Sequence, residues 1–256
     1  MSAPRVELSE LCVSYGGRRA IGPVDLVVPS GSITALVGPS GCGKSSLLAA
    51  LNRMDELVDG CAVQGAVRVD GCDVRAADVD PVLLRRRMGL IFQRPQPFPF
   101  GIARNVALGL REHRLCTRAE EPARIEEALR AVGLWDEVAE RLDEPATRLS
   151  GGQQQRLCLA RALALEPEVL LLDEPCSALD PVASARVEQL IRELRGRYTV
   201  LIVTHNLAQA RRLADRTAFF WVREGVGRLV EEAPTEELFL RPREELTARY
   251  MEGAVG

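Results

Sequence analysis

The architecture of this 256-residue chain is governed by the stretch Gly38-Pro39-Ser40-Gly41-Cys42-Gly43-Lys44-Ser45. It matches the phosphate-loop pattern G-x-x-x-x-G-K-[ST] at every fixed position. An apolar run, residues 33–37, precedes it, and residues 46–54 have the character of the first turns of a helix. Glycines let a backbone approach a phosphate, and successive N–H groups at a helix N-terminus then face the anion. The pattern and its context therefore predict a phosphate-binding loop rather than a chance glycine-rich turn.

Lys44 and Ser45 carry the chemistry expected of such a loop. Lys44 would reach the β- and γ-phosphates of a nucleotide, and the Ser45 hydroxyl would bind Mg²⁺. Lys44 is also the only lysine in the chain, because every other Lys or Arg position is Arg. A compact, flexible ammonium group suits a phosphate at this point. We expect the loop, together with the Ser46 that follows it, to bind the nucleotide.

Composition excludes several other classes of protein. The formal charge is −3, so no excess of basic residues indicates nucleic-acid binding, and the only basic triplet, residues 85–87, is typical of a solvated helix face. Seven cysteines without a C-x-x-C pair, and only two histidines, disfavour zinc and suit a reducing cytosol. The sequence shows neither a signal peptide nor a run of about 18 apolar residues. A membrane function would therefore need a partner.

A second chemical motif ends an apolar run at residues 169–172, where Asp173 and Glu174 follow directly. A parallel strand places such acids at the carboxyl edge of the sheet, next to the phosphates. Asp173 would hold Mg²⁺ through water, and Glu174 would polarise the attacking water. Two acids that merely end a strand are the alternative, which the upstream loop disfavours.

A third motif, Leu149-Ser150-Gly151-Gly152-Gln153, stands directly before a predicted helix. Ser150 is a favourable N-cap, and adjacent glycines at a helix N-terminus form a second anion-binding site. One chain with one nucleotide has no need for two such sites. The second site is explained if it meets the nucleotide of another copy.

The remaining pattern alternates apolar strands with amphipathic helices, which predicts an α/β fold with a largely parallel sheet. Strands are expected at 6–14, 24–28, 33–37, 66–70, 89–92, 169–172, 199–204, 217–222 and 227–230. Helices are expected at 46–54, 81–87, within 102–141, and at 153–165, 182–194, 207–213, 235–240 and 243–251. We expect one domain, 1–256. Its nucleotide-binding core and N-terminal antiparallel β layer would occupy 1–93 and 166–256, with a helical subdomain inserted at 94–165.

These motifs together resemble the ATP-binding subunit of an ABC transporter. Five sequence features of that family occur here in the family's order: the phosphate loop at 38–45, Gln93, the LSGGQ signature at 149–153, the Asp173-Glu174 strand end, and His205. The resemblance covers the whole chain. It implies a P-loop NTPase with a RecA-like core that hydrolyses ATP with Mg²⁺.

The resemblance also implies a role for several single residues. Tyr15 is similar to the aromatic residue that stacks on adenine. Gln93 is similar to the residue that touches Mg²⁺ and the attacking water and relays contact to the membrane subunits. His205 is similar to the switch histidine that contacts the γ-phosphate, so that Glu174, His205 and Gln93 would form the catalytic group.

A head-to-tail homodimer is a further implication. Ser150, Gly151 and Gly152, with Gln153, would bind the γ-phosphate of the partner copy, and residues 177–180 resemble the loop that crosses that interface.

The resemblance also implies partners in the membrane. Two transmembrane permease subunits would dock near residues 93–100, where three prolines forbid regular structure. By itself that loop is equally compatible with local packing. A periplasmic or extracellular solute-binding protein would act indirectly, and the chain would lie at the cytoplasmic face of a bacterial membrane.

Several stretches are similar to the ATPase of bacterial phosphate importers in particular: 51–54, 79–82 and 84–87, Gln93 with 97–99, 153–158, 198–206 and 215–220. No physical argument links these residues to phosphate, because other subunits select the solute. The departures are Cys176, where the family usually has Thr, Arg94, where relatives often have Lys, and a more divergent tail from Val222.

The alternatives are an importer ATPase for phosphonate or a polar amino acid, a soluble ABC-type ATPase acting on DNA or ribosomes, and a regulator without turnover. The soluble class usually carries a long coiled-coil insertion or two nucleotide domains, which this sequence does not have. Glu174 and His205 disfavour the regulator.

Overall fold

A computed structural model of the chain describes residues 5–253. They form two compact units, which are described separately. The first unit contains the residues up to Leu90, Glu168–Glu174 and the residues from Leu194 onward, and the second contains Ile91–Pro167 and Pro175–Glu193. The sequence placed residues 175–193 with the sheet, whereas they group here with the helices. The reason is packing, because helix α7 (Pro181–Glu193) lies against helix α6 (Gly151–Leu163).

The first unit is built on a ten-stranded mixed sheet with the order β5-β4-β1-β2-β10-β9-β3-β8-β7-β6. Its strands are β1 (Val6–Tyr15), β2 (Arg18–Val28), β3 (Ile33–Val37), β4 (Cys61–Val69), β5 (Cys72–Asp73), β6 (Met88–Ile91), β7 (Val169–Asp173), β8 (Thr199–Val203), β9 (Arg216–Arg223) and β10 (Val226–Pro234). Its helices are α1 (Lys44–Leu51), η1 (Met54–Leu57), α2 (Pro81–Arg87), α8 (Leu207–Leu213), α9 (Thr235–Leu240) and α10 (Glu245–Met251).

The expectation of a largely parallel sheet holds for only part of it. Strands β9, β3, β8 and β7 are parallel neighbours, whereas β1, β2, β4 and β5 pair antiparallel. The antiparallel strands are not a detached layer, because β10 pairs with both β9 and β2 and makes the sheet continuous. Every residue of β3 and β8 is buried, as the unbroken apolar runs predict for strands covered on both faces.

Strand β2 is longer than its sequence suggested. A strand was expected at 24–28, yet β2 begins at Arg18 and runs through Gly22 and Pro23. Gly22 has a φ of +106°, and a Cβ there would lie 2.3 Å from the carbonyl oxygen of Leu11 on β1. The glycine therefore marks a close approach of two backbones within the sheet rather than its end.

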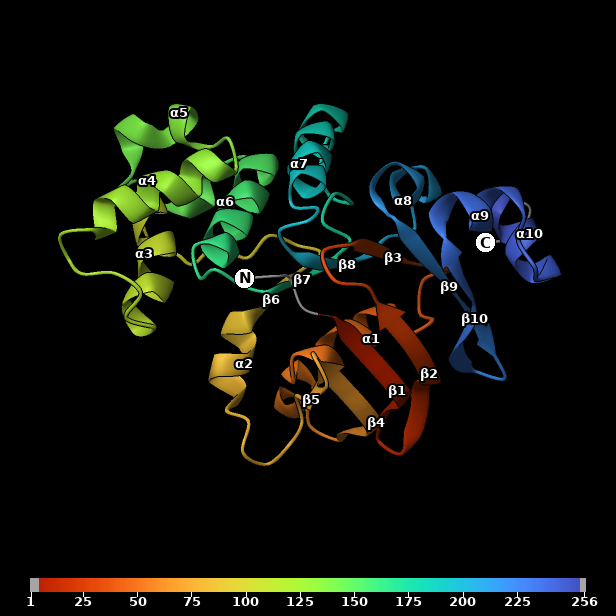
Figure 1. The fold of residues 1–256 in the computed structure, drawn as a ribbon. Helices are drawn as coiled ribbons and strands as arrows, with labels where there is room; N and C mark the ends of the chain where they lie inside the picture. The colour runs from red at the N-terminus through yellow and green to blue at the C-terminus, as the bar shows by residue number, and fades with distance from the viewer. Residues whose placement is uncertain (1–4, 254–256) are drawn as a thin grey trace. The chain divides into compact units, whose positions relative to one another are not determined.

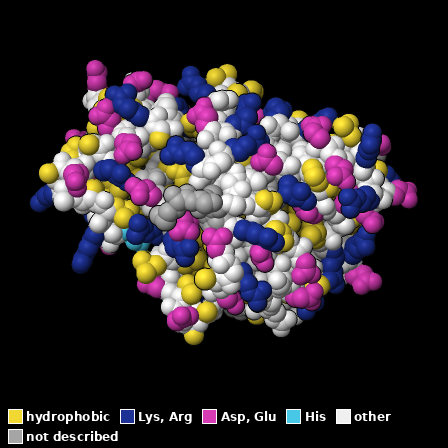
Figure 2. Space-filling model, viewed as in Figure 1, with side chains coloured by type: hydrophobic (Ala, Val, Ile, Leu, Met, Phe, Trp, Pro, Cys, Tyr) yellow, Lys and Arg dark blue, Asp and Glu magenta, His cyan; other side chains and the backbone are white. Residues whose placement is uncertain are grey.

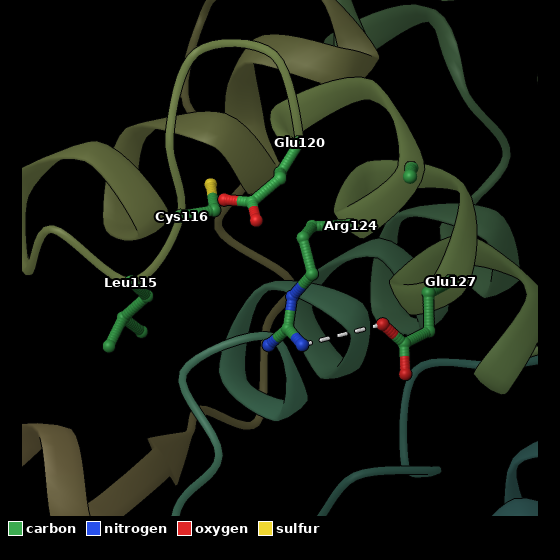
Figure 3. Close-up of a pocket in the computed structure, with 6 residues that line it drawn as sticks. Leu115, Cys116, Glu120, Arg124 and Glu127 are labelled. Carbon is green, nitrogen blue, oxygen red and sulfur yellow. Dashed lines mark ion pairs between the residues drawn. The ribbon is translucent and has the colours of Figure 1, made fainter.

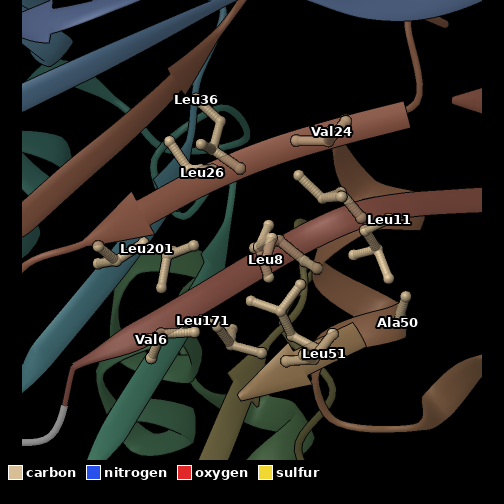
Figure 4. Close-up of a cluster of buried hydrophobic side chains, with 14 of the residues drawn as sticks. Val6, Leu8, Leu11, Val24, Leu26, Leu36, Ala50, Leu51, Leu171 and Leu201 are labelled. Atoms are coloured by element: carbon tan, nitrogen blue, oxygen red, sulfur yellow. The ribbon is translucent and has the colours of Figure 1, made fainter. Parts of the chain in front are cut away.

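The core of the first unit lies between the antiparallel strands, helix α1 and the parallel strands. Figure 4 shows Val6 and Leu8 from β1 beside Leu51 of α1, and Leu171 and Leu201 from the parallel strands. Burying each leucine contributes about 2 kcal/mol relative to leaving it exposed. This core holds α1, and therefore the loop before it, against the carboxyl edge of the sheet.

The second unit is helical, and its α3–α6 segment is drawn in yellow-green to green in Figure 1. It contains α3 (Ile102–Glu112), α4 (Glu121–Ala131), α5 (Trp135–Val138), η2 (Ala139–Arg141), η3 (Ala146–Arg148), α6 and α7. Ile125, Leu129 and Val132, which recur at i, i+4 and i+7 in the sequence, are buried, as one apolar face of a helix requires. The helical unit thus has a core of its own.

The surface of the described residues is mixed in charge. Figure 2 shows acidic and basic side chains interspersed over the visible face. Among residues 5–253, none of the helices combines the length and the apolar character needed to cross a membrane.

Candidate functional site

The phosphate loop joins β3 to α1, and its shape depends on glycine at two points. Gly38 has a φ of +145°, and a Cβ there would lie 2.2 Å from the carbonyl oxygen of Phe220. Gly43, at φ +90°, is the N-cap of α1, and a Cβ there would lie 2.7 Å from the Cβ of Ile21. A larger residue fits neither position. Because Gly43 has no side chain to cap the helix, the first N–H groups of α1 remain available to an anion.

Lys44 is folded back over this loop. Its Nζ donates to the carbonyl oxygens of Gly38 at 2.7 Å and Pro39 at 2.8 Å, and lies 3.4 Å from Sγ of Cys42. The side chain is nearly buried, with 5% of the residue exposed. The ammonium is therefore held at the loop by acceptors that phosphate oxygens could replace.

Ser45 and Asp173 bring a hydroxyl and a carboxylate together, because α1 begins where β7 ends. Ser45 Oγ donates to Asp173 Oδ1 at 3.0 Å. Burial raises the pKa of Asp173 above its ordinary value, the Ser45 hydrogen bond lowers it, and the charge of Glu174 raises it further. Mg²⁺ prefers oxygen ligands and usually keeps waters beside one or two carboxylates. This pair of oxygens fits that preference.

Glu174 and His205 lie next to each other at the same edge. Their strands, β7 and β8, are parallel, so both carboxyl ends emerge together. Glu174 Oε1 is 3.1 Å from His205 Nδ1, and the Glu174 N–H donates to the carbonyl oxygen of Val203 at 2.9 Å. The backbone of Glu174 is left-handed, with a φ of +44°, which costs about 1–3 kcal/mol for a residue with a side chain.

Tyr15, expected to stack on adenine, ends β1 near the start of α1. Burial raises the pKa of its hydroxyl, and a side-chain hydrogen bond to Ser46 acts in the opposite direction. Its ring packs partly against the core. The structure thus brings Tyr15 to the residue that follows the phosphate loop.

In the second unit, Ser150 caps α6 as expected. Its Oγ accepts the N–H of Gln153 at 3.4 Å, and its own N–H donates to Gln153 Oε1 at 3.0 Å, which forms a reciprocal capping box. A Cβ on Gly152 would lie 2.6 Å from the Cβ of Ala183 on α7. Gly152 is therefore required by the packing of α6 against α7.

Gln93 lies in the same unit, and its Nε2 donates to Oγ of Ser177 at 3.3 Å. The loop after it is ordered by Asn105, which is fully buried. The Asn105 side chain accepts the N–H of Phe98 at 2.8 Å and donates to the carbonyl oxygens of Phe98 and Gly101 at 3.2 and 3.0 Å. Arg161 lies over the Phe98 ring, 4.4 Å from its centroid, and Phe98 remains 38% exposed. The loop is held firmly while presenting an aromatic surface.

A pocket elsewhere in this unit is lined by Leu115, Cys116, Glu120, Ala123, Arg124 and Glu127. Figure 3 shows the Arg124 guanidinium pointing to Glu127, 3.5 Å away, and Arg124 also pairs with Glu166. Because its cation is already paired with carboxylates, this pocket has no character of a phosphate site.

The predicted residues thus fall into two sets. The first unit brings together Tyr15, residues 38–46, Asp173, Glu174 and His205, whereas Gln93 and residues 150–153 belong to the second unit. Sequence reasoning missed Tyr250 of α10, which packs on Phe219 with ring centroids 4.7 Å apart and whose hydroxyl interacts with the backbone of Gly38. Nothing in the sequence around a tyrosine in a short terminal helix could have revealed that contact.

A glycine-shaped phosphate loop before a helix, beside an acidic carboxyl edge of parallel strands, defines a phosphate-loop nucleotide-binding protein of the α/β class. A family model described as ABC transporter matches residues 21–177. The chain belongs to the ABC transporter family. As such it is an ATP-binding ATPase, a kind of subunit that dimerises and works with transmembrane permeases.

Two individual proteins illustrate the similarity. The phosphate import ATP-binding protein PstB 1 of Nitrosococcus oceani is 55% identical over 251 residues, which are 98% of this chain and 91% of that protein. A solved structure of a bacterial Atm1-family ABC exporter with ATP bound is 27% identical, with a TM-score of 0.78. The match covers 99% of this chain but 42% of the exporter chain, so this chain spans less than half of that protein's length.

Proposed function

We propose that this chain is the ATP-hydrolysing subunit of an importer that takes up inorganic phosphate across the cytoplasmic membrane. The solute is suggested by 55% identity to a phosphate import ATP-binding protein over nearly the whole chain. The ATPase chemistry is supported above all by one observation. Glu174 and His205 lie 3.1 Å apart at the sheet edge where Ser45 meets Asp173.

In this proposal ATP is held by the phosphate loop, and Tyr15 stacks on its adenine. Lys44 leaves the carbonyl oxygens of Gly38 and Pro39 for the β- and γ-phosphates. Ser45, Asp173 and Gln93 would hold Mg²⁺, which neutralises charge on the phosphates when bound. Binding thus replaces contacts within the loop by contacts to the nucleotide.

Glu174 is the residue that activates water. Its carboxylate accepts a hydrogen bond from the attacking water and polarises it toward the γ-phosphate. His205 orients the Glu174 carboxylate through Nδ1 and presents its other ring nitrogen to the γ-phosphate. The left-handed backbone at Glu174 supports this role, because local strain is common where a side chain must be aimed.

Two copies would act together. The Ser150–Gly152 nest of one copy covers the γ-phosphate bound by the partner, so ATP closes the dimer and hydrolysis lets it open. Two permease subunits would dock near residues 93–100 and convert closure into alternating access. The chain would thus lie at the cytoplasmic face of the membrane, held there by its partners.

The substitution Glu174→Gln tests the assignment directly. We expect the variant to bind ATP normally and to release phosphate at least about 100-fold more slowly, because the amide cannot accept a proton from water. Phosphate release is measured with the malachite-green assay, and ATP binding is measured by equilibrium titration. Glu112→Gln, an exposed change in the second unit, is the matched control. Unchanged phosphate release by Glu174→Gln would remove this residue from its role.

The solute needs a separate experiment. The permease subunits that co-purify with the chain would be placed in vesicles with their solute-binding protein. ATPase activity would then be measured with phosphate, a phosphonate or a polar amino acid. We expect stimulation by phosphate, and stimulation by another solute alone would reject the phosphate assignment while leaving the ATPase intact.

A further inference from the structure

The carboxylate of Glu137, in the short helix α5, lies at the centre of a hydrogen-bond network in the second unit. Its Oε2 accepts Gln153 Nε2 at 2.8 Å, and Arg156 Nη2 lies 2.9 Å from both of its oxygens. Arg186 Nη1, from α7, lies 3.2 Å from Oε1. Donors from two helices, α6 and α7, therefore converge on one acidic group that lies outside every motif recognised in the sequence.

This network controls which way the Gln153 amide points. A carboxylate only accepts hydrogen bonds, so it must face the NH₂ group of the amide rather than its oxygen. The amide oxygen is then directed to the N–H of Ser150, 3.0 Å away. Without Glu137 the amide could rotate, and the capping box that orients Ser150 would lose one of its two bonds.

The charges around Glu137 keep its carboxylate ionised. Burial by itself would raise the pKa of Glu137, but hydrogen bonds from Gln153 and Arg156 outweigh it and hold the pKa below its usual value. Arg156 is nearly buried, with 6% of its side chain exposed. Removing the carboxylate would thus leave a buried cation without its partner, which is costly.

Arg186 extends the network toward the loop before α7. The side chain of Asp180 accepts the N–H groups of Val182 and Ala183 at 2.9 and 3.0 Å and so caps that helix. Ala183 is the residue that packs against Gly152. Glu137 therefore joins the signature to the helix that follows residues 177–180, the loop expected at the same dimer interface.

We propose that Glu137 is a positioning residue that holds Ser150, Gly151 and Gly152 in the geometry that receives the partner copy's nucleotide. This inference rests on the proposed function, because it assumes that the signature acts in an ATP-closed dimer. It predicts a defect in closure with intact nucleotide binding, because the phosphate loop belongs to the other unit.

The test introduces Glu137→Gln into the full-length Glu174→Gln chain and follows ATP-dependent dimer formation by sedimentation velocity. An amide at this position presents donors to Gln153 and Arg156, so we expect the protein concentration for half dimerisation to rise about tenfold or more. Glu140→Gln, an exposed change in η2, is the matched control and should leave dimerisation unchanged. Arg186→Gln should shift it in the same direction by a smaller factor.

Two measurements separate positioning from a structural role. Binding of trinitrophenyl-ATP to the monomer should match the parent within error, whereas the thermal midpoint should fall because the buried Arg156 loses its charged partner. In the chain with intact Glu174, the Glu137→Gln variant should reach parental ATPase turnover once protein concentration is saturating.

Dimerisation of Glu137→Gln like the parent would overturn the inference, as would a loss of monomer ATP binding. If Glu174→Gln itself formed no dimer with ATP, the proposed function would fail and the inference with it. A normal dimer in both variants would reject the inference alone.

Discussion

At the scale of single residues, the site depends on side chains that are enclosed so closely that a larger side chain would not fit in their place. Lys44 is enclosed by two carbonyl oxygens and the Cys42 sulfur, all within 3.4 Å of its ammonium. An ammonium is a point charge that fits such a space, whereas a guanidinium is a wider planar fork. This difference explains why a chain that otherwise uses only Arg has Lys at this position.

The corresponding prediction concerns Lys44→Arg. The charge is kept, but the fork cannot occupy the same enclosed position, so we expect ATPase activity to fall at least about 100-fold with weaker ATP binding. Arg118→Lys, an exposed exchange in the other direction, should leave both unchanged. Phosphate release and ATP titration provide the comparison, and near-normal turnover by Lys44→Arg would show that charge alone suffices.

At the scale of elements, packing between helices shapes the signature. Gly151 and Gly152 are adjacent, yet their surroundings differ. A Cβ at Gly152 would lie 2.6 Å from Ala183 Cβ, whereas one at Gly151 would meet only Leu179 Cδ2, at 3.8 Å. The first distance is a clash between α6 and α7, and the second is an ordinary contact.

Alanine substitutions distinguish these two positions. Gly152→Ala should destabilise the chain by about 1–3 kcal/mol, because the helices must separate to admit a methyl group. Gly151→Ala should change stability far less. Urea titration of each variant measures its free energy of unfolding. An equal loss of this free energy in the two variants would contradict the packing geometry.

A second element, α10, packs close to the start of the phosphate loop. Tyr250 is 6% exposed and stacks on Phe219, the β9 residue that pairs with Val37 directly before the loop. Burial raises the pKa of the Tyr250 hydroxyl, the charge of Cys42 raises it further, and a hydrogen bond with the backbone of Gly38 lowers it. The C-terminal helix thus places one hydroxyl near the backbone at the start of the loop.

Tyr250→Phe should remove that hydroxyl and keep the ring. We expect a loss of about 0.5–1.5 kcal/mol in stability and an ATP affinity reduced by a few-fold, because the interaction of the hydroxyl with the backbone of Gly38 is lost. The ring centroids of Trp221 and Tyr250 lie 6.1 Å apart, so the fluorescence of Trp221 can report the change. Tyr198→Phe, at a partly exposed ring beside Arg197, is the control. Identical ATP titrations for parent and Tyr250→Phe would exclude this support.

At the scale of the whole molecule, the motifs are divided between two units. The phosphate loop, Asp173, Glu174 and His205 belong to one, and Gln93 and the signature belong to the other. A head-to-tail dimer would complete each site with a signature from the partner copy. Closure would then require both units of both copies.

Ser150→Arg tests this arrangement. A guanidinium at the N-cap would fill the space intended for the partner's γ-phosphate, so we expect no ATP-dependent dimer in the Glu174→Gln background. Gel filtration in the presence of ATP measures dimer formation. The nearby control is Arg148→Lys, four residues before Gly152. A stable dimer of the Ser150→Arg variant would contradict the role assigned to the signature.

Local patterns predicted most elements of this chain well, because the signals were strong and short in range. Helices α2 and α8 have the expected bounds, and β3 runs from Ile33 to Val37 as its apolar run indicated. The reach of β2 through Gly22 was missed, since the conformation of that glycine depends on Leu11 across the sheet. The extent of the antiparallel pairing was also missed, because pairing depends on residues far apart in the chain.

The sequence by itself determined the class of chemistry, because glycine, lysine and carboxylate side chains at set spacings allow few other uses. Only the tertiary structure decided how those groups are supported. The contact of Tyr250 with the phosphate loop, the clash that demands Gly152 and the network around Glu137 all join residues that lie far apart along the chain. Such contacts arise from packing in three dimensions, which no local pattern of residues encodes.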